Sequence, residues 1–169
     1  MTLSIYDVSI NALIRGLSNL STVLDKAAAH AAARKFDPVA LVQSRLFPDM
    51  YPLVRQVQIA CDTAKGAAAR LASVDVPKHE DNETTLEELK LRVAKTVEFL
   101  KSVQPAAVNG PAERAIELKF PNGAMKFTAT SYVVDFVLPN FYFHASMVYA
   151  LLRTNGVELG KGDFLGTLP

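Results

Sequence analysis

The chain has 169 residues, 50% of them hydrophobic and 21% charged, and its 18 basic and 17 acidic residues leave a formal net charge of +1. The length suits a single domain spanning residues 1–169, and the hydrophobic fraction is too high for a disordered chain. The near-neutral charge removes the electrostatic argument for binding nucleic acid or acidic membranes. One Cys excludes an internal disulfide and a cysteine-rich metal site, whereas three His still permit a small metal site.

The N-terminal segment is predicted to be helical. Its apolar residues recur at spacings of three and four, as a helix with one buried face requires: Ile10, Leu13, Ile14, Leu17, Leu20 and Leu24. The helix can continue through the alanine-rich stretch near His30, because Ala has the highest helix propensity. Asp37 and Pro38 then resemble an N-cap and a first-turn proline, and they predict a short helix toward Leu46.

Two more long helices follow. The second apolar stripe consists of Leu53, Val57, Ala60, Cys61, Ala64, Ala68 and Leu71. Residues 74–83 are charged and contain a proline, which is typical of a solvated loop. Thr85 and Glu88 form a capping box, the sequence signature of a helix start. We expect the third helix to run from there to Pro105, which ends it.

The hydrophobic period then changes from helical to alternating. Residues 116–120 and 125–127 alternate apolar with polar side chains, and Asn122-Gly123 lies between the two runs. Asn-Gly between alternating runs is the strongest short-range signal for a β-hairpin. We therefore expect a small two-stranded ribbon packed on a helical body.

A fourth helix is predicted from Ser131 onward. Pro139 should kink this helix or delay its true start, and Gly156 should end it in a left-handed conformation. In the tail that follows, Phe164 and Leu165 are expected to dock on the body. The sum of these elements is an all-α four-helix bundle with a small β-hairpin before the last helix.

His144 is the main candidate for chemistry. It lies in an aromatic segment of the last helix, and Asn140 shares its face one turn earlier. Imidazole is a good ligand for zinc, nickel and iron, although a metal site would favour His at both positions. The alternative is a buried histidine that is hydrogen-bonded to a neighbour.

Asp62 is the second candidate. It lies beside the apolar stripe of the second long helix, with Gln58 one turn before it. Its carboxylate could face the interior and meet His144, where it would orient a general base. It could also point to solvent or pair with Arg55 or Lys65.

The aromatic residues of the last helix are expected in the core, at an interface or in the wall of a ligand pocket. They are Tyr132, Phe136, Phe141, Tyr142, Phe143 and Tyr149. Segment 1–24 carries charges inside its apolar pattern and so lacks a signal-peptide core. The longest uncharged run, 136–152, is interrupted by proline and polar residues and falls short of the ~20 apolar residues that span a bilayer. We expect a cytoplasmic protein without membrane or nucleic-acid partners.

Four segments carry a resemblance to a known family. They are 46–50 (LFPDM), 56–62 (QVQIACD), 139–144 (PNFYFH) and 151–166 (LLRTNGVELGKGDFLG). They resemble an uncharacterised bacterial domain-of-unknown-function family, which is similar to the DinB/YfiT-like metalloenzyme superfamily. The resemblance covers nearly the full chain. It implies an up-down-down-up four-helix bundle, often dimeric, with a divalent metal held by one His from helix two and a His-x-x-x-His pair from the last helix.

This chain departs from that pattern. His144 matches the second His of the pair, Asn140 occupies the first position, and helix two offers Gln58 or Asp62 instead of His. The favoured hypothesis is therefore a homodimer that either binds a small ligand or has a degenerate site, lacks the three-His site and needs no cofactor, with Gln58 and Tyr142 in its pocket. The alternative is a hydrolase or thiol-dependent transferase with His144 and Asp62 as catalytic residues. In that case zinc or nickel would sit at His144, Asn140 and Asp62.

Overall fold

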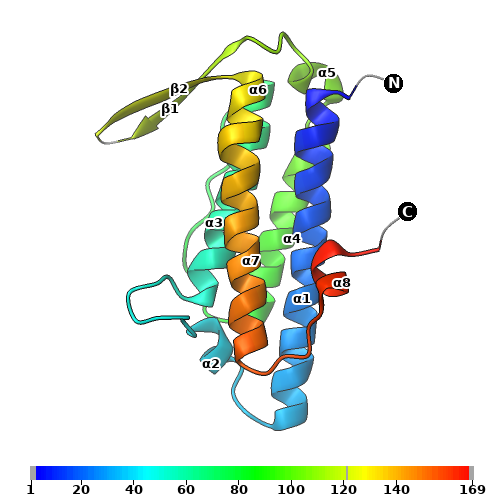
Figure 1. Cartoon of the computed structure of the whole chain (residues 1–169), viewed down its shortest axis with the longest axis vertical. Coiled ribbons are helices and arrows are strands. Elements are labelled where there is room, and N and C mark those ends of the chain that lie inside the picture. The colour runs from blue at the N-terminus through cyan, green and yellow to red at the C-terminus, as the bar shows by residue number, and fades with distance from the viewer. Residues whose placement is uncertain (1–2, 121, 168–169) are drawn as a thin grey trace.

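Long helices run side by side along the molecule in the computed structural model, which describes residues 3–120 and 122–167 (Figure 1). The longest in that part of the chain are α1 (Ala12–Arg34), α3 (Leu53–Ala72), α4 (Leu86–Ser102) and α7 (Leu138–Thr154). α1 packs against α4 and α7, and α3 packs against the same two helices. α1 and α7 run in one direction and α3 and α4 in the other, so the predicted up-down-down-up bundle is confirmed.

The first helix confirms the predicted extension through the alanine-rich stretch. A π-helical turn, η1 (Asp7–Asn11), leads directly into α1. The apolar stripe faces the core, and Leu13, Leu17 and Leu24 have no exposed surface. The helix continues past His30 and ends where Lys35 adopts a left-handed conformation with φ 56°.

The short helix after it is shorter than predicted. α2 spans Val39–Val42 and does not approach Leu46. The Asp37 carboxylate accepts a hydrogen bond from the Val39 backbone N–H at 2.9 Å, as expected near a helix start. The Ser44 hydroxyl donates to the Leu41 carbonyl at 2.7 Å. Such local side-chain bonds compete with helix continuation, which explains the early end.

The capping box before α4 is confirmed. The Thr85 hydroxyl accepts from the Glu88 backbone N–H at 3.2 Å, and the Glu88 carboxylate accepts from the Thr85 N–H at 3.1 Å. Before it, segment 73–85 returns along the bundle from the end of α3 to the start of α4, which makes these two helices parallel (Figure 1). Pro105 ends the long helix and begins the short helix α5 (Pro105–Val108).

The predicted hairpin is also confirmed. β1 (Ala115–Phe120) and β2 (Gly123–Thr128) pair antiparallel in one sheet, and Figure 1 shows them reaching away from one end of the bundle. Ile116 and Leu118 on β1 are buried against the body. Gly123 has φ +144°, a conformation that other residues rarely adopt.

The last long helix begins with irregular turns. A single turn, α6 (Ala129–Ser131), precedes a π-helical segment, η2 (Tyr132–Val137), and α7 follows. Pro139 lies in the first turn of α7, where its missing N–H is tolerated. The proline therefore delays the regular α-helix instead of breaking the chain's path.

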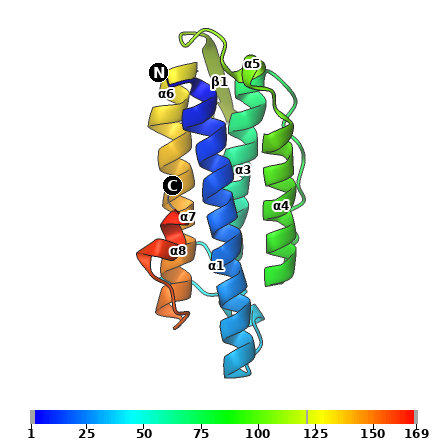
Figure 2. The same ribbon diagram turned by 90° about the vertical axis from the view of Figure 1, so that its right-hand side faces the viewer.

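The tail docks on the body as expected. Gly156, with φ +86°, ends α7, and α8 (Lys161–Leu165) then packs against α1 (Figure 2). Phe164 contacts the core, and Val157 and Leu159 are buried. No helix among the described residues combines the length and apolarity needed to cross a membrane.

Candidate functional site

His144 lies where α7 packs against α3, and only 8% of the residue is exposed. Its Nδ1 atom is 2.7 Å from the Oε1 atom of Gln56 on α3. Gln56 is itself buried and follows Leu53 by one helical turn on the core-facing side. His144 is thus held by a partner from the neighbouring helix, as one of the two sequence interpretations expects.

The Gln56 amide determines which His144 nitrogen carries the proton. The amide N–H of Gln56 donates to the Tyr51 carbonyl at 3.2 Å, and a carbonyl can only accept. The Gln56 oxygen therefore faces His144, and His144 Nδ1 must be the donor. In the neutral ring this leaves the lone pair on Nε2.

The environment of His144 favours this neutral form. Burial lowers the pKa of His144 below its ordinary value of 6.5, and the positive charge of Arg55 lowers it further. Both effects disfavour the imidazolium, which is the charged form of this ring. The residue is therefore an uncharged hydrogen-bond donor to Gln56 near neutral pH.

Asn140 also contacts α3, but not at the same partner. Its amide donates to the Thr63 hydroxyl at 2.7 Å. Asn140 and His144 thus lie on the same side of α7, as their spacing predicts, and each is bonded to a different α3 side chain.

Asp62 points to α4 and not to His144. Its Oδ1 atom is 2.7 Å from Arg92 Nη2 and 2.9 Å from Lys65 Nζ. Gln56 and Asp62 are six residues apart on α3, which separates them by about 9 Å along the axis and about 120° around it. The expected meeting of Asp62 with His144 is therefore not found, whereas the alternative pairing with Lys65 is.

Arg92 is the buried centre of an ionic cluster that reaches the surface. Its side chain is 2% exposed and lies 2.7 to 2.9 Å from carboxylate oxygens of Asp62, Asp81 and Glu83. The hydrogen bond to Glu83 and the nearby negative charges outweigh burial and raise the pKa of Arg92. These contacts attach segment 73–85 to α3 and α4, so the cluster is structural.

Gln58, expected in a ligand pocket, belongs to this same cluster. Its amide N–H donates to Glu83 at 2.9 Å, and its oxygen accepts from Arg55 at 3.2 Å. Cys61 lies on the buried face of α3, where burial raises the pKa of its thiol to about 12. Such a thiol is not a nucleophile near neutral pH.

A three-histidine metal site does not fit the residues present. His144 supplies one imidazole, but Asn140 and Gln56, its neighbours at the α3–α7 contact, offer only amides, which are poor ligands for zinc or nickel. Across residues 3–120 and 122–167, no group of three or more His, Cys, Asp or Glu side chains is placed to hold a metal ion.

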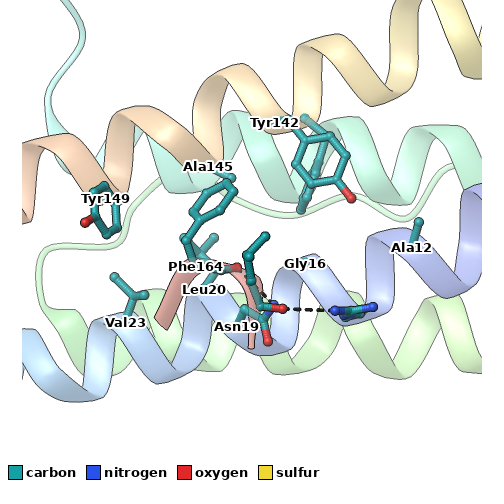
Figure 3. A pocket seen from close by; sticks show the side chains of 12 residues that line it. Ala12, Gly16, Asn19, Leu20, Val23, Tyr142, Ala145, Tyr149 and Phe164 are labelled. Atoms are coloured by element: carbon teal, nitrogen blue, oxygen red, sulfur yellow. Dashed lines mark hydrogen bonds between the residues drawn. The ribbon is translucent and has the colours of Figure 1, made fainter. Parts of the chain in front are cut away.

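A pocket of about 260 Å³ opens on the other side of α7, between α1, α7 and α8 (Figure 3). Most of its wall is apolar or aromatic, with Leu20, Phe141, Ala145, Tyr149 and Phe164 among the lining residues. The polar groups in the wall are Arg15, Asn19 and the hydroxyls of Tyr142 and Tyr149. Larger hollows lie between α1 and α4 and beside segment 73–85, but both are more open to solvent.

A glycine allows the helices to form this wall. A Cβ atom on Gly16 would lie 2.5 Å from Cε1 of Phe141, which is closer than real Cβ contacts. Gly16 on α1 therefore leaves space for the fully buried Phe141 ring of α7. The two helices approach closely at this point, and the pocket opens beside it (Figure 3).

Side chains of α1 hold α8 over the pocket. Arg15 donates to the Leu165 carbonyl at 3.1 Å, and Asn19 donates to the Phe164 carbonyl at 3.1 Å. Lys26 forms an ion pair with Asp163 at 2.7 Å. The last helix is therefore fastened to the first along one edge of the pocket.

Sequence reasoning placed Tyr142 in a pocket and missed the residues facing it. Gln56, the partner of His144, could have been found, because it is a polar residue within the apolar stripe between Leu53 and Ala60. Arg15 and Asn19 carried no such signal. Their role depends on which helix α8 covers, and periodicity does not determine that.

Comparisons with known proteins give a family but no activity. The family described as "Domain of unknown function (DUF1993)" matches residues 5–165. The crystal structure of a DinB family member protein from Shewanella denitrificans is 41% identical in sequence, with a TM-score of 0.90. The alignment covers 97% of this chain and 93% of that one. A search of curated proteins finds no significant match.

Proposed function

Because the chain belongs to the DUF1993 family, whose description assigns no activity, we propose from its geometry that the protein binds a small molecule in the pocket between α1, α7 and α8. The observation that carries this proposal is the pocket itself. Its apolar and aromatic wall with a few polar groups is the usual composition of a small-molecule site.

The size of the pocket limits the ligand. An apolar cavity of about 150 Å³ accommodates benzene. A pocket of about 260 Å³ therefore has room for one aromatic ring with a short substituent, or for a branched aliphatic molecule of similar bulk.

We also propose that the protein acts as a homodimer without metal chemistry. Large apolar side chains that remain exposed support the dimer, because such surface is costly to leave in water. Phe143 is 55% exposed, Tyr51 57% and Phe47 64%. Light scattering should give twice the monomer mass, and a monomer at high concentration would refute the dimer.

Toluene is a suitable first probe for the pocket because it is apolar and of the right bulk. Ligand-observed NMR should detect its binding to the wild type. Ala145→Leu fills the pocket and should lower the affinity at least about tenfold, because the added side chain occupies the ligand's volume. Ala94→Leu, on the exposed face of α4, is the matched control and should leave binding unchanged. If Ala145→Leu retains its helical circular dichroism and still binds toluene, the pocket is not the site.

One observation favours a second candidate, a hydrolase in which His144 is the general base. Gln56 fixes the proton on Nδ1, so Nε2 keeps the lone pair that accepts a proton in such a step. Gln56 would take the orienting role that the sequence suggested for Asp62. A thiol-dependent transferase would need an external thiol, since Cys61 is buried.

Hydrolysis of p-nitrophenyl acetate tests this candidate. His144→Gln should lower kcat/KM at least about a hundredfold, the usual contribution of a general base. His30→Gln removes a histidine at the far end of α1 and serves as control. Equal rates for the two variants would exclude His144 as the base.

A further inference from the structure

Arg15 brings a positive charge to the wall of the pocket without an acidic partner. Among residues 3–120 and 122–167 it donates one hydrogen bond, from Nη2 to the Leu165 carbonyl, and a guanidinium carries five N–H donors. In the described part of the chain Arg15 forms no ion pair, whereas Arg55 and Arg92 both do. Donors of Arg15 are thus left for a ligand.

Two acidic side chains of the flanking segments, Asp163 and Asp7, already have partners. Asp163 on α8 pairs with Lys26 at 2.7 Å and accepts from the Gly160 N–H at 2.8 Å. Asp7, ahead of α1, accepts from Ser4 and from Asn11. Neither carboxylate is therefore free to neutralise Arg15, and a bound anion could do so.

The charged group of the pocket lies toward one end, whereas the hydroxyl at the other end, of Tyr149, is already bonded to the Leu159 carbonyl. Figure 3 shows Ala12 and Tyr142 at one end and Val23 and Tyr149 at the other, with Phe164 between them. Arg15 lies between Ala12 and Gly16 in α1, so it belongs to the Tyr142 end. The Tyr142 hydroxyl has no hydrogen bond to any described residue, which leaves it free to donate to a ligand.

We propose that the ligand is a small monocarboxylate. Its carboxylate accepts hydrogen bonds from Arg15 and from the Tyr142 hydroxyl, and its apolar body lies toward Leu20, Ala145 and Phe164. Planar, two-oxygen acceptors match the guanidinium fork, and charge-assisted bonds are the stronger class. This inference rests on the proposed binding function, and it adds the charge and polarity of the ligand.

Phenylacetate and phenylacetamide form a matched pair of probes. They have the same size and shape, but only phenylacetate carries a negative charge. A hydrogen bond to a charged group contributes more than a neutral one, so phenylacetate should bind wild-type protein at least about tenfold more tightly, measured by calorimetry. Raising the salt concentration should lower the affinity for phenylacetate and leave the affinity for phenylacetamide unchanged.

Variants assign the preference to particular groups. Arg15→Gln should lower the affinity for phenylacetate at least about tenfold and change that for phenylacetamide less than about twofold. Tyr142→Phe should lower phenylacetate affinity about threefold, because it removes one neutral donor. Arg34→Gln, at the other end of α1, changes the net charge equally and should have no effect.

The outcomes separate this inference from the function it rests on. If phenylacetate and phenylacetamide bind equally, or if toluene binds and phenylacetate does not, the carboxylate preference is refuted while the pocket remains a binding site. If Arg15→Gln weakens both ligands alike, Arg15 only holds α8, and the inference is again refuted. If neither these ligands nor toluene binds, the proposed function fails as well.

Discussion

Two long helices of this bundle, α3 and α1, differ in the contacts that their polar side chains make. On α3, Gln56 is bonded to His144, Thr63 to Asn140 and Asp62 to Arg92, and each contact joins α3 to another element. On α1, Arg15 and Asn19 hold α8 but also border a hollow of about 260 Å³.

This difference distinguishes polar side chains that stabilise the fold from polar side chains that are available to a ligand. Polar groups that are buried and mutually satisfied contribute to a unique fold and have little left to offer a ligand. Polar groups beside an apolar hollow, with donors unused, are available to one. The residues that the sequence indicates as candidates for chemistry lie on the α3 side, yet the pocket with room for a ligand lies on the α1 side.

The largest expected effect tests whether the α3 side is structural. Arg92→Met removes the buried cation, while Lys65, Arg55 and Gln58 remain as partners of Asp62, Asp81 and Glu83. Breaking a buried ion pair on one side costs about 3–5 kcal/mol, and because Asp62 and Asp81 are partly exposed we expect a loss near the lower end, about 3 kcal/mol, in the free energy of unfolding in urea. Lys78→Met removes an exposed partner of Glu80 and should change it by less than about 0.5 kcal/mol. Equal effects would contradict a structural cluster.

The next effect tests the close approach beside the pocket. Helix propensity alone predicts that Gly16→Ala stabilises the protein by about 1 kcal/mol. Overpacking against Phe141 costs about 1–3 kcal/mol, so we expect a net loss of up to about 2 kcal/mol in urea unfolding.

Gly66→Ala in α3 is the matched control for this prediction. Its new methyl group would meet the far end of the Arg70 side chain, which can move aside at the cost of its hydrogen bond to the Tyr132 hydroxyl. This variant should therefore lose less stability than Gly16→Ala, whose methyl group meets the Phe141 ring. A stabilised Gly16→Ala would show that the two helices can separate at little cost.

A smaller effect concerns pH and His144. Burial holds the pKa of His144 below 6.5 in the folded protein, so the unfolded chain binds the proton first as pH falls. The free energy of unfolding should therefore decrease below about pH 6.5. His79, whose pKa is lowered by burial and by Lys65 and Arg92, acts in the same direction.

Urea unfolding at several pH values measures this effect. His144→Gln should make the decrease shallower, and combining it with His79→Gln should make it shallower again. An unchanged slope in His144→Gln would mean that the ring is already protonated or is not buried in solution.

The smallest expected effect is an absence of reaction. Burial raises the pKa of Cys61 to about 12, so a thiol reagent near pH 8 should not modify the native protein and should modify it fully after denaturation. Modification of the native protein within minutes would show that the α3 side opens to solvent, and would contradict its purely structural role.

The sequence predicts the helices and the hairpin because hydrophobic periodicity, helix caps and turn residues are local signals. The stripes of the long helices, Thr85 with Glu88, and Asn122-Gly123 each determine an element from a few neighbouring residues. The predicted end of the short helix near Leu46 was wrong. The hydrogen bond from the Ser44 hydroxyl to the Leu41 carbonyl competes with continuation of α2.

The candidate site could be predicted only in part. His144 was expected to form a hydrogen bond with a neighbour. An apolar stripe does not determine which α3 residue faces His144, and that residue is Gln56 instead of Asp62. The pocket is made by α1, α7 and α8, whose contacts cross most of the chain. Arg15 and Phe164 share a wall only after the bundle has formed, so no sequence pattern joins them.

The fastening of α8 to α1 has a consequence for when the site comes into being. Arg15 and Leu165 are 150 residues apart, and Asn19 and Phe164 are 145 apart. A ribosome delivers the N-terminal part of a chain first. The four-helix body can therefore assemble before the pocket has its last wall, and the proposed ligand could be held only after α8 has been synthesised.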